Sequence, residues 1–317
     1  MYVTSVDSRS NMPVALITGI AGFTGDYLTR DLQARGYRVV GLDQRSGVSL
    51  ESESDDPEEV TVFRCDLMDR GGLERVVRRI EPDVVVHLAA ISFVAHGDAD
   101  AIYRINVVGT RNLLEALASL EKKPSAVLLA SSANIYGNTA VSVIDETVFP
   151  YPANDYAVSK LAMEYMARLW MDRLPIVMVR PFNYTGVGQA PQFLLPKIVD
   201  HFQRREAVIE LGNLDVERDF SDVRFVTHAY GELLQRAPAG EVFNICSGRV
   251  YSLKDILRMM GEIAGYEIDV RVNPAFVRQN EVKRLQGDNN KLKLCAGDLI
   301  NIPLQETLRW MYSRGTC

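Results

Sequence analysis

Tyr156 and Lys160 stand four residues apart in the segment NDYAVSK, which is expected to open a helix. Residues at this spacing share one face of a helix, so the phenol and the ammonium would lie close together. A neighbouring ammonium lowers the pKa of a phenol and tunes it for proton transfer to or from a sugar or alcohol oxygen. No other tyrosine in the sequence has a lysine four residues later. Surface helices carry such pairs too, so the pair alone is a weak indication.

Ser132 belongs to the segment SSANIYG, directly after the expected strand Ala126–Ala130. In open α/β sheets, ligands bind at the carboxyl ends of the parallel strands. From that edge, the hydroxyl of Ser132 can form a hydrogen bond with the oxygen on which the tyrosine acts. Without the other motifs, this serine is equally compatible with the simple end of a strand. Together the three side chains predict an acid–base centre with Ser132, Tyr156 and Lys160 as catalytic residues.

A glycine loop follows the first expected strand, in the segment VALITGIAGFTG. Gly19 permits a tight turn, Gly22 lets the backbone approach a pyrophosphate, and Gly25 allows close contact between helix and strand. The N–H groups of the first helical turn, around Phe23 and Thr24, favour negative charge. Because turns use glycine in many proteins, the context of strand, loop and helix carries the prediction of a bound nucleotide.

Asp43 ends the second expected strand, 18 residues after Gly25. An acid at this place can accept both ribose hydroxyls of an adenosine and repels a 2′-phosphate, so the sequence favours NAD over NADP. Arg45 could instead partner a phosphate, which leaves NADP open. A third interpretation is that Asp43 only begins a loop as an Asx turn.

The elements that must position these residues alternate between short apolar runs and helical patterns. The expected strands are Val14–Thr18, Arg38–Leu42, Val60–Arg64, Val84–Leu88, Ala126–Ala130 and Ile176–Arg180. The expected helices are Gly25–Arg35, Arg70–Ile80, Ala99–Leu120 and Asn154–Met171. Several strands are apolar throughout, which is typical of strands buried on both faces of a parallel sheet. The pattern predicts a doubly wound α/β fold, with residues 1–180 as the nucleotide-binding domain.

Residues 181–317 are expected to form mainly a smaller α+β domain, with some segments able to return to the first sheet. This half opens with the loop RPFNYTGVGQAPQ. Its expected elements are helices at Pro196–Arg205, Ser252–Ala264 and Leu304–Tyr312 and a strand at Val242–Cys246. The acidic stretch Ser49–Glu59, in the first half, is interpreted as a solvated loop.

The composition is that of an ordinary globular protein, with 317 residues, 47% hydrophobic and 24% charged. It excludes a disordered or fibrous chain, and no apolar run reaches the ~18 residues of a membrane span. A net charge of −6 argues against nucleic acid as a partner. The four cysteines form no CxxC pair and no metal site is indicated. The first residues contain no apolar secretory segment, so we expect a cytoplasmic protein.

In order along nearly the whole chain, these motifs resemble the extended short-chain dehydrogenase/reductase family, in its nucleotide-sugar branch of NAD-dependent epimerases and dehydratases. Besides the glycine loop, Ser131-Ser132 and the Tyr156/Lys160 pair, the matching motifs are Asp66-Leu67, His87-Leu88-Ala89-Ala90, Asn106-Val107-xx-Thr110, Arg180-Pro181-Phe182-Asn183 and Arg218-Asp219-Phe220. The resemblance implies a Rossmann domain with a smaller substrate-binding domain. It further implies roles at the cofactor: Asp66 and Leu67 flank the adenine, Leu88, Ala89 and Ala90 line the cofactor, Asn106 orders the site, and Pro181 and Phe182 face the nicotinamide.

Within this branch, RPFNYTGVGQ is similar to the RPFNHTGPGQ of GDP-4-keto-6-deoxy-D-mannose reductases, with Tyr184 and Val187 as departures. The resemblance implies a GDP-linked sugar as substrate. The implied contacts are Asn183 at the diphosphate, Lys197 at the nucleotide, Arg218 at the pyrophosphate, Arg278 at a phosphate and Glu281 at the ribose. Lys197 and Glu281 are equally compatible with surface charges that have no role.

Ala133 and Asn134 stand where the 4,6-dehydratases of this branch carry an acid. Neither side chain ionises, so removal of the C5 proton lacks its base and dehydration is disfavoured. The 4-epimerases also lack this acid, and their serine segment can read SSATVYG, close to SSANIYG here. Phe225, where relatives often have aspartate, changes local helix contacts rather than the chemistry.

The resemblance therefore implies an oxidoreductase that reduces the C4 keto group of a GDP-4-keto-6-deoxyhexose with NAD(P)H, giving a product such as GDP-D-rhamnose. The alternatives are an NAD-dependent nucleotide-sugar 4-epimerase, a GDP-mannose 4,6-dehydratase and, in a different class, a non-catalytic NAD-binding scaffold. The helices Ala99–Leu120 and Asn154–Met171 are similar to the pair that forms a four-helix dimer interface in this family. Their apolar residues are equally compatible with the core of a monomer.

Overall fold

The computed structural model describes residues 12–45, 60–92, 97–276 and 282–314. A seven-stranded sheet in the order β10-β6-β5-β4-β1-β2-β3 forms its centre, and all its neighbouring strands are parallel. The strands are β1 Val14–Thr18, β2 Arg38–Asp43, β3 Thr61–Arg64, β4 Val84–His87, β5 Ala126–Ala130, β6 Ile176–Pro181 and β10 Val242–Ile245. The six strands expected in the first half are all present, and the predicted doubly wound fold is confirmed.

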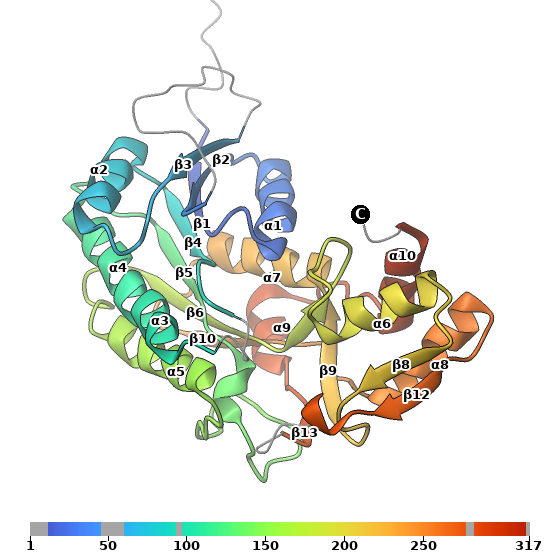
Figure 1. Cartoon of the computed structure of the whole chain (residues 1–317). Helices are drawn as coiled ribbons and strands as arrows, with labels where there is room; N and C mark the ends of the chain where they lie inside the picture. Colours follow the sequence, from blue (N-terminus) through green and yellow to red (C-terminus); the bar gives the residue numbers. More distant parts are fainter. Residues whose placement is uncertain (1–11, 46–59, 93–96, 277–281, 315–317) are drawn as a thin grey trace, which may run out of the picture.

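Helices cover both faces of this sheet (Figure 1). One layer comprises α2 Arg70–Ile80, α3 Ala99–Tyr103, α4 Thr110–Ser119 and α5 Asp155–Arg168. The other comprises α1 Phe23–Ala34, α7 Val223–Arg236 and α9 Asn290–Ala296. Two separate apolar cores lie between the sheet and these layers. Along β1, Leu16 packs into the first core and Ile17 into the second, because successive side chains of a strand point to opposite faces. This explains why the strand is apolar throughout.

The remaining elements form a smaller lobe with its own apolar core. Its helices are α6 Leu194–Gln203, α8 Leu253–Ala264 and α10 Leu304–Arg314, and β8 Val208–Leu211 pairs with β12 Asp269–Val272. A second small sheet centres on β9 Glu217–Asp222, which pairs with β7 Asn183–Thr185, β11 Val250–Ser252 and β13 Arg284–Leu285. The second half of the chain also supplies α7, β10 and α9 to the large sheet, so the two parts interleave (Figure 1).

Among the elements that differ from the sequence prediction, two concern the helices that pack on the large sheet. The helix expected over Ala99–Leu120 is interrupted by a π-helical segment, Arg104–Gly109, of the kind that often marks functional sites. The helix α7 was not predicted at all. Its first half, VRFVTHAY, is rich in β-branched and aromatic residues, which favour strands. Burial against α1 and the sheet overrides that local preference. The acidic stretch Ser49–Glu59 lies outside the described residues.

A buried ion pair fastens α5 to β6. Arg180 donates from Nε to Glu164 Oε1 at 2.9 Å and from Nη2 to Oε2 at 2.7 Å, with the side chains only 5% and 1% exposed. The remaining Nη1 donates to the hydroxyl of Tyr136 at 2.8 Å, and Tyr136 donates to Asn244 Oδ1 at 2.8 Å. This network joins four elements, because Tyr136 lies in the short turn after β5 and Asn244 lies in β10.

Replacing Glu164 by glutamine leaves the guanidinium of Arg180 buried beside a neutral amide. Breaking a buried ion pair costs about 3–5 kcal/mol. We therefore expect Glu164→Gln to lower the free energy of unfolding by about that amount, as measured by urea denaturation. Asp26→Asn is the matched control, because Asp26 and Arg30 form an ion pair with side chains 59% and 71% exposed. The control should change the free energy of unfolding by less than about 1 kcal/mol. Equal losses in the two variants would contradict the prediction that the buried ion pair stabilises the fold more than the exposed one.

Candidate active site

The glycine loop places the N-terminus of α1 at the carboxyl edge of the sheet. Gly19 has a φ of +71°, and a Cβ there would lie 2.8 Å from the backbone of Ala89. A Cβ on Gly25 would lie 2.1 Å from the carbonyl oxygen of Ile20. Gly22, at the N-cap, brings no side chain over the first helical turn. The backbone of the loop is therefore closely packed, and the positive end of the α1 dipole lies beside it. This arrangement fits the pyrophosphate of a dinucleotide.

The residues predicted at the adenine end come together on neighbouring strands. Asp43 ends β2, and its carbonyl accepts the N–H of Cys65 at 2.9 Å, which places Asp66 one residue beyond. Asp66 accepts a hydrogen bond from Gln44 Nε2 at 2.9 Å. Asp43 Oδ1 accepts the backbone N–H of Arg45 at 2.9 Å, which is the Asx turn that the sequence left open. The Asx turn engages one carboxylate oxygen of Asp43, which lies at the carboxyl end of β2.

A buried chain of hydrogen bonds organises the segment after β4. His87 contacts Thr18 Oγ1 at 2.6 Å through Nδ1 and Thr110 Oγ1 at 2.8 Å through Nε2. Thr110 donates its own proton to the carbonyl of Asn106 at 2.7 Å, so His87 must donate from Nε2 and accept at Nδ1. Burial, helped by the nearby Lys160 ammonium, lowers the pKa of His87 to about 3 and keeps the ring neutral.

Asn106 holds the loop that carries Leu88, Ala89 and Ala90. Its side chain accepts the N–H of Ile91 at 2.9 Å and donates to the carbonyl of Ile91 at 3.1 Å. It also donates to Ser159 Oγ on α5 at 3.0 Å. Asn106 thus ties the cofactor-facing loop to the helix that carries Tyr156 and Lys160. It lies in the π-helical segment and is buried.

The three predicted catalytic side chains are brought together and buried, each 5–7% exposed. Ser132 caps the turn after β5 and accepts hydrogen bonds from Asn134 N at 3.2 Å and from Asn134 Nδ2 at 3.1 Å. Lys160 Nζ donates to the carbonyl of Ala130 at 2.7 Å. The side chain of Tyr156 forms a hydrogen bond with that of Ser132. One acid–base group therefore lies where β5 and α5 meet, at the edge predicted for ligands.

The electrostatics of Tyr156 correct one expectation from the sequence. Burial raises the pKa of Tyr156 to about 12, although the hydrogen bond to Ser132 partly offsets this. Burial also lowers the pKa of Lys160 to about 8, while the charge of Glu164 acts to raise it. The ammonium does not depress the phenol pKa as predicted, because the phenol is fully desolvated and Lys160 donates to Ala130 instead. At pH 7 the phenol is protonated and Lys160 is mostly charged, a state suited to giving a proton.

Two residues predicted to face the nicotinamide, and after them the predicted substrate residues, lie along the chain from the end of β6 into the smaller lobe. Phe182 is buried against Ile135 and Tyr136, and Pro181 ends β6. Asn183 begins β7, and its amide donates to the carbonyl of Asp219 at 3.4 Å. Arg218, on β9, donates to the carbonyls of Glu217 and Lys283 at 3.0 and 3.2 Å, and Lys197 Nζ donates to the carbonyl of Glu210 at 2.7 Å. Arg278 and Glu281 lie outside the described residues.

Two further groups in these segments were given no role from the sequence. Asp219 is fully buried and accepts the N–H groups of Ser247, Gly248 and Gly287 at 2.8, 2.9 and 3.3 Å, as well as Ser247 Oγ at 2.6 Å. Burial raises its pKa to about 6, against the effect of these bonds. Tyr184 forms a hydrogen bond with Thr24 at 2.8 Å. The motifs RDF and RPFNY contain both residues, but their partners are too distant in sequence to be inferred.

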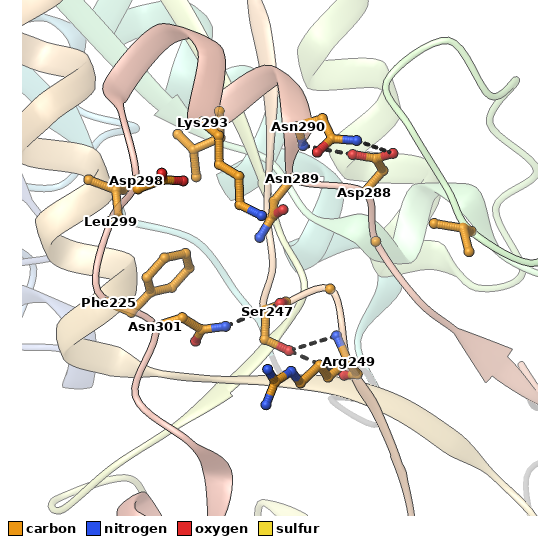
Figure 2. A pocket seen from close by; sticks show the side chains of 14 residues that line it. Phe225, Ser247, Arg249, Asp288, Asn289, Asn290, Lys293, Asp298, Leu299 and Asn301 are labelled. Atoms are coloured by element: carbon orange, nitrogen blue, oxygen red, sulfur yellow. Dashed lines mark hydrogen bonds between the residues drawn. The ribbon is translucent and has the colours of Figure 1, made fainter.

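A cavity of about 520 Å³ opens beside the loop that Asp219 holds (Figure 2). Figure 2 shows Lys293, Asn301, Ser247 and Arg249 around it, with Phe225 on one wall. Its lining contains none of the three catalytic side chains. The cavity is therefore separate from the site formed by Ser132, Tyr156 and Lys160. Phe225, the departure noted in the sequence, is one of its walls.

Within the ranges that the structure describes, no three His, Cys, Asp or Glu side chains are placed to hold a metal ion. No helix in those ranges is both long and apolar enough to cross a bilayer. Cys65, Cys246 and Cys295 are free thiols, and the first two are buried.

Two curated proteins are similar to most of this chain. A GDP-6-deoxy-D-talose 4-dehydrogenase of Aggregatibacter actinomycetemcomitans is 33% identical over 280 residues, which cover 87% of this chain and 89% of the relative. A GDP-6-deoxy-D-mannose reductase of Pseudomonas aeruginosa is 34% identical over 308 residues, which cover 94% and 95%. Both relatives are named for redox chemistry on a GDP-linked 6-deoxy sugar.

Solved structures agree with the fold. A Burkholderia cenocepacia protein, provisionally described as an epimerase, is 55% identical with a TM-score of 0.87 over 95% of this chain and 97% of that one. The structure of RMD from Pseudomonas aeruginosa complexed with NADPH is 30% identical, with a TM-score of 0.81 over 95% and 98%. A family model described as GDP-mannose 4,6 dehydratase matches residues 16–308. On this match and on these relatives, the chain belongs to the GDP-mannose 4,6-dehydratase family of extended short-chain dehydrogenases/reductases.

Proposed function

We propose that this enzyme reduces the C4 keto group of a GDP-4-keto-6-deoxyhexose, of the GDP-4-keto-6-deoxy-D-mannose to GDP-D-rhamnose type. The observation that carries the proposal is the Ser132–Tyr156–Lys160 group beside the non-ionising side chains Ala133 and Asn134. This group can exchange a proton at C4 but offers no carboxylate for dehydration at the neighbouring position. The names of two relatives, a GDP-6-deoxy-D-mannose reductase and a GDP-6-deoxy-D-talose 4-dehydrogenase, support the same reading.

A nicotinamide cofactor bound along the carboxyl edge supplies the hydride. Gly19, Gly22 and Gly25 cradle its pyrophosphate, and Asp43 accepts the adenosine ribose hydroxyls, which favours NAD while NADP stays possible. Asp66 and Leu67 bound the adenine, Leu88 to Ala90 line the groove, and Pro181 and Phe182 face the ring. Tyr156 gives its proton to the oxygen that forms at C4, and Ser132 shares that oxygen's hydrogen bonding. Lys160, whose Nζ donates to the carbonyl of Ala130, supplies the positive charge one helical turn from Tyr156.

In this proposal, residues 1–180 hold mainly the cofactor and residues 181–317 mainly the sugar nucleotide. Asn183 and Arg218 stand on neighbouring strands of one small sheet, where Asn183 is paired with Phe220, two residues after Arg218. A guanidinium suits a diphosphate. We assign Asn183 and Arg218 to the diphosphate, Lys197 to the nucleotide, and Arg278 and Glu281 to the phosphate and ribose. A cytoplasmic location remains a prediction.

We also propose a homodimer through a four-helix bundle. On α5, Val158 and Tyr165 are 38% and 54% exposed, and Leu169, at the C-cap of the helix, is 79% exposed. They repeat at intervals of seven and four residues, so they line one face of the helix. Val108, in the adjoining π-helical segment, is 39% exposed. A second copy that docks these two helices on their equivalents buries this apolar stripe.

Product mass tests the reaction. The protein is incubated with GDP-4-keto-6-deoxymannose, GDP-mannose or UDP-glucose, each with and without NADH or NADPH. We expect a gain of two hydrogens on the keto sugar only, and only with reduced cofactor. Loss of water from GDP-mannose would identify a dehydratase, and a new C4 isomer of unchanged mass would identify an epimerase. Either result would overturn the reductase proposal, as would the absence of any reaction.

Replacing Tyr156 by phenylalanine removes only the hydroxyl that gives the proton. We expect kcat to fall by about 10²–10⁴-fold, while the dissociation constant for NADH, measured by calorimetry, stays within about threefold of wild type because the ring is retained. Tyr37→Phe is the matched control, because Tyr37 precedes β2 at the opposite end of the sheet. Unchanged turnover in Tyr156→Phe would exclude Tyr156 as the proton donor.

Replacing Leu169 by aspartate places a charge on the exposed stripe of α5. We expect light scattering to report twice the mass of one chain for the wild type and one chain mass for Leu169→Asp, because the charge would be buried without a partner. Leu294→Asp is the control, since Leu294 is 89% exposed on α9, on the other side of the sheet. A wild-type monomer, or a Leu169→Asp dimer, would contradict the proposed interface.

A further inference from the structure

The strand β7 faces the glycine loop through Tyr184. The Tyr184 hydroxyl and Thr24 Oγ1 form a hydrogen bond of 2.8 Å. The Tyr184 ring stacks on Phe23, with 6.1 Å between centroids and 15° between the planes. Phe23 and Thr24 are the first two residues of α1, where the helix offers its N–H groups to the pyrophosphate. One side chain from the second half of the chain therefore contacts the first turn of the cofactor-binding helix through both its ring and its hydroxyl.

The residue before it, Asn183, belongs to the sugar-nucleotide side. Successive side chains of a strand point to opposite faces, so Asn183 and Tyr184 lie on opposite faces of β7. The amide of Asn183 is held at 3.4 Å by the carbonyl of Asp219 on β9, the strand that also carries Arg218. β7 thus has the cofactor loop on one side and the proposed diphosphate contacts on the other.

A second contact holds the same segment against α1. The hydroxyl of Tyr27 donates to the carbonyl of Val187 at 2.7 Å, and the ring of Tyr27 meets that of Phe23 edge to face at 5.6 Å. The amide of Gln189 donates to the carbonyl of Tyr184 at 3.2 Å, while its oxygen accepts from Thr185 Oγ1 at 2.7 Å. These hydrogen bonds connect residues 184–189 to one another and to α1. We therefore expect β7 to move together with the first turn of α1.

We propose that Tyr184 is a positioning residue that couples the dinucleotide site to the sugar-nucleotide site through its hydrogen bond to Thr24. Binding of a pyrophosphate at the first turn of α1 fixes Thr24, and Thr24 fixes Tyr184 and the strand that carries Asn183. Each nucleotide then binds more tightly when the other is present, because the cost of ordering the shared contact is met once. This inference rests on the proposed function and assigns Tyr184 no direct contact with the reacting atoms.

Calorimetric titration of NADH and of GDP, each with and without saturating amounts of the other, measures the coupling. We expect the wild type to bind each nucleotide about three- to tenfold more tightly with the other present, by the same factor in both directions. Tyr184→Phe keeps the ring stack and removes the hydroxyl. It should weaken NADH binding by about two- to tenfold and bring the coupling factor close to one, with GDP binding in the absence of NADH unchanged.

Three further variants separate this role from a general loss of structure. Thr24→Val should reproduce Tyr184→Phe, and the double variant should be no worse than either single one, because both remove the same bond. Thr24→Ser keeps a hydroxyl and should retain the coupling. Tyr266→Phe is the control, since the Tyr266 hydroxyl donates to the carbonyls of His201 and Phe202 at the end of α6 and of Glu206 just after it, at 3.3 to 3.4 Å. Its coupling should equal that of the wild type.

The outcomes distinguish this inference from the proposed function. A wild type that binds both nucleotides without coupling, or a Tyr184→Phe variant that keeps the wild-type factor, would overturn the role of Tyr184 and leave the reductase standing. Additive losses in the double variant would also overturn it. A wild type that binds neither NADH nor GDP would remove the proposed function itself, and the coupling with it.

Discussion

The ion pair between Glu164 and Arg180 is the contact on which the geometry of the site depends. It clamps α5, which carries Tyr156 and Lys160, onto β6, which leads to Pro181 and the substrate-side strand β7. Through the hydroxyl of Tyr136, the same guanidinium also holds the turn that begins at Ser132. The three side chains predicted to be catalytic come from two different elements, and this network sets their relative position. A neutral core could pack these elements equally tightly, but it would lack the fixed directions of a bidentate pair.

Burial sets the charge states at the carboxyl edge. Removal from water raises the pKa of Tyr156 and lowers those of Lys160 and His87, since in each case the charged form is the one that is penalised. Glu164 acts against this on Lys160 and keeps the ammonium available near neutral pH. The outcome is a protonated Tyr156 and a mostly charged Lys160 on α5, with a neutral His87 at the end of β4. For a reductase, that is the state required before the proton is transferred.

The two halves of the chain interleave around the large sheet. The second half builds the smaller lobe, yet it also returns α7, β10 and α9 to the large sheet. β10 places Asn244 in the Arg180 network, and α7 packs against α1 behind the glycine loop. Because the two halves interleave, residues of one half contact residues of the other directly. The hydrogen bond between Tyr184 and Thr24 is one such contact, between β7 and the first turn of α1.

The amino-acid sequence by itself determined the strands of the large sheet and the chemical types in the site. The strands Val14–Thr18 and Ala126–Ala130 were predicted to the residue, because strands buried on both faces must be apolar throughout. The glycine loop and the Tyr156/Lys160 pair are local patterns, and in combination with Ser132 and the surrounding strands and helices they predicted the chemistry. Tertiary structure alone decided the helix α7, the neutral state of His87 and the raised pKa of Tyr156. It also decided the bond from Tyr184 to Thr24, whose partners are 160 residues apart. Those features depend on desolvation and on contacts between distant segments, which no local pattern encodes.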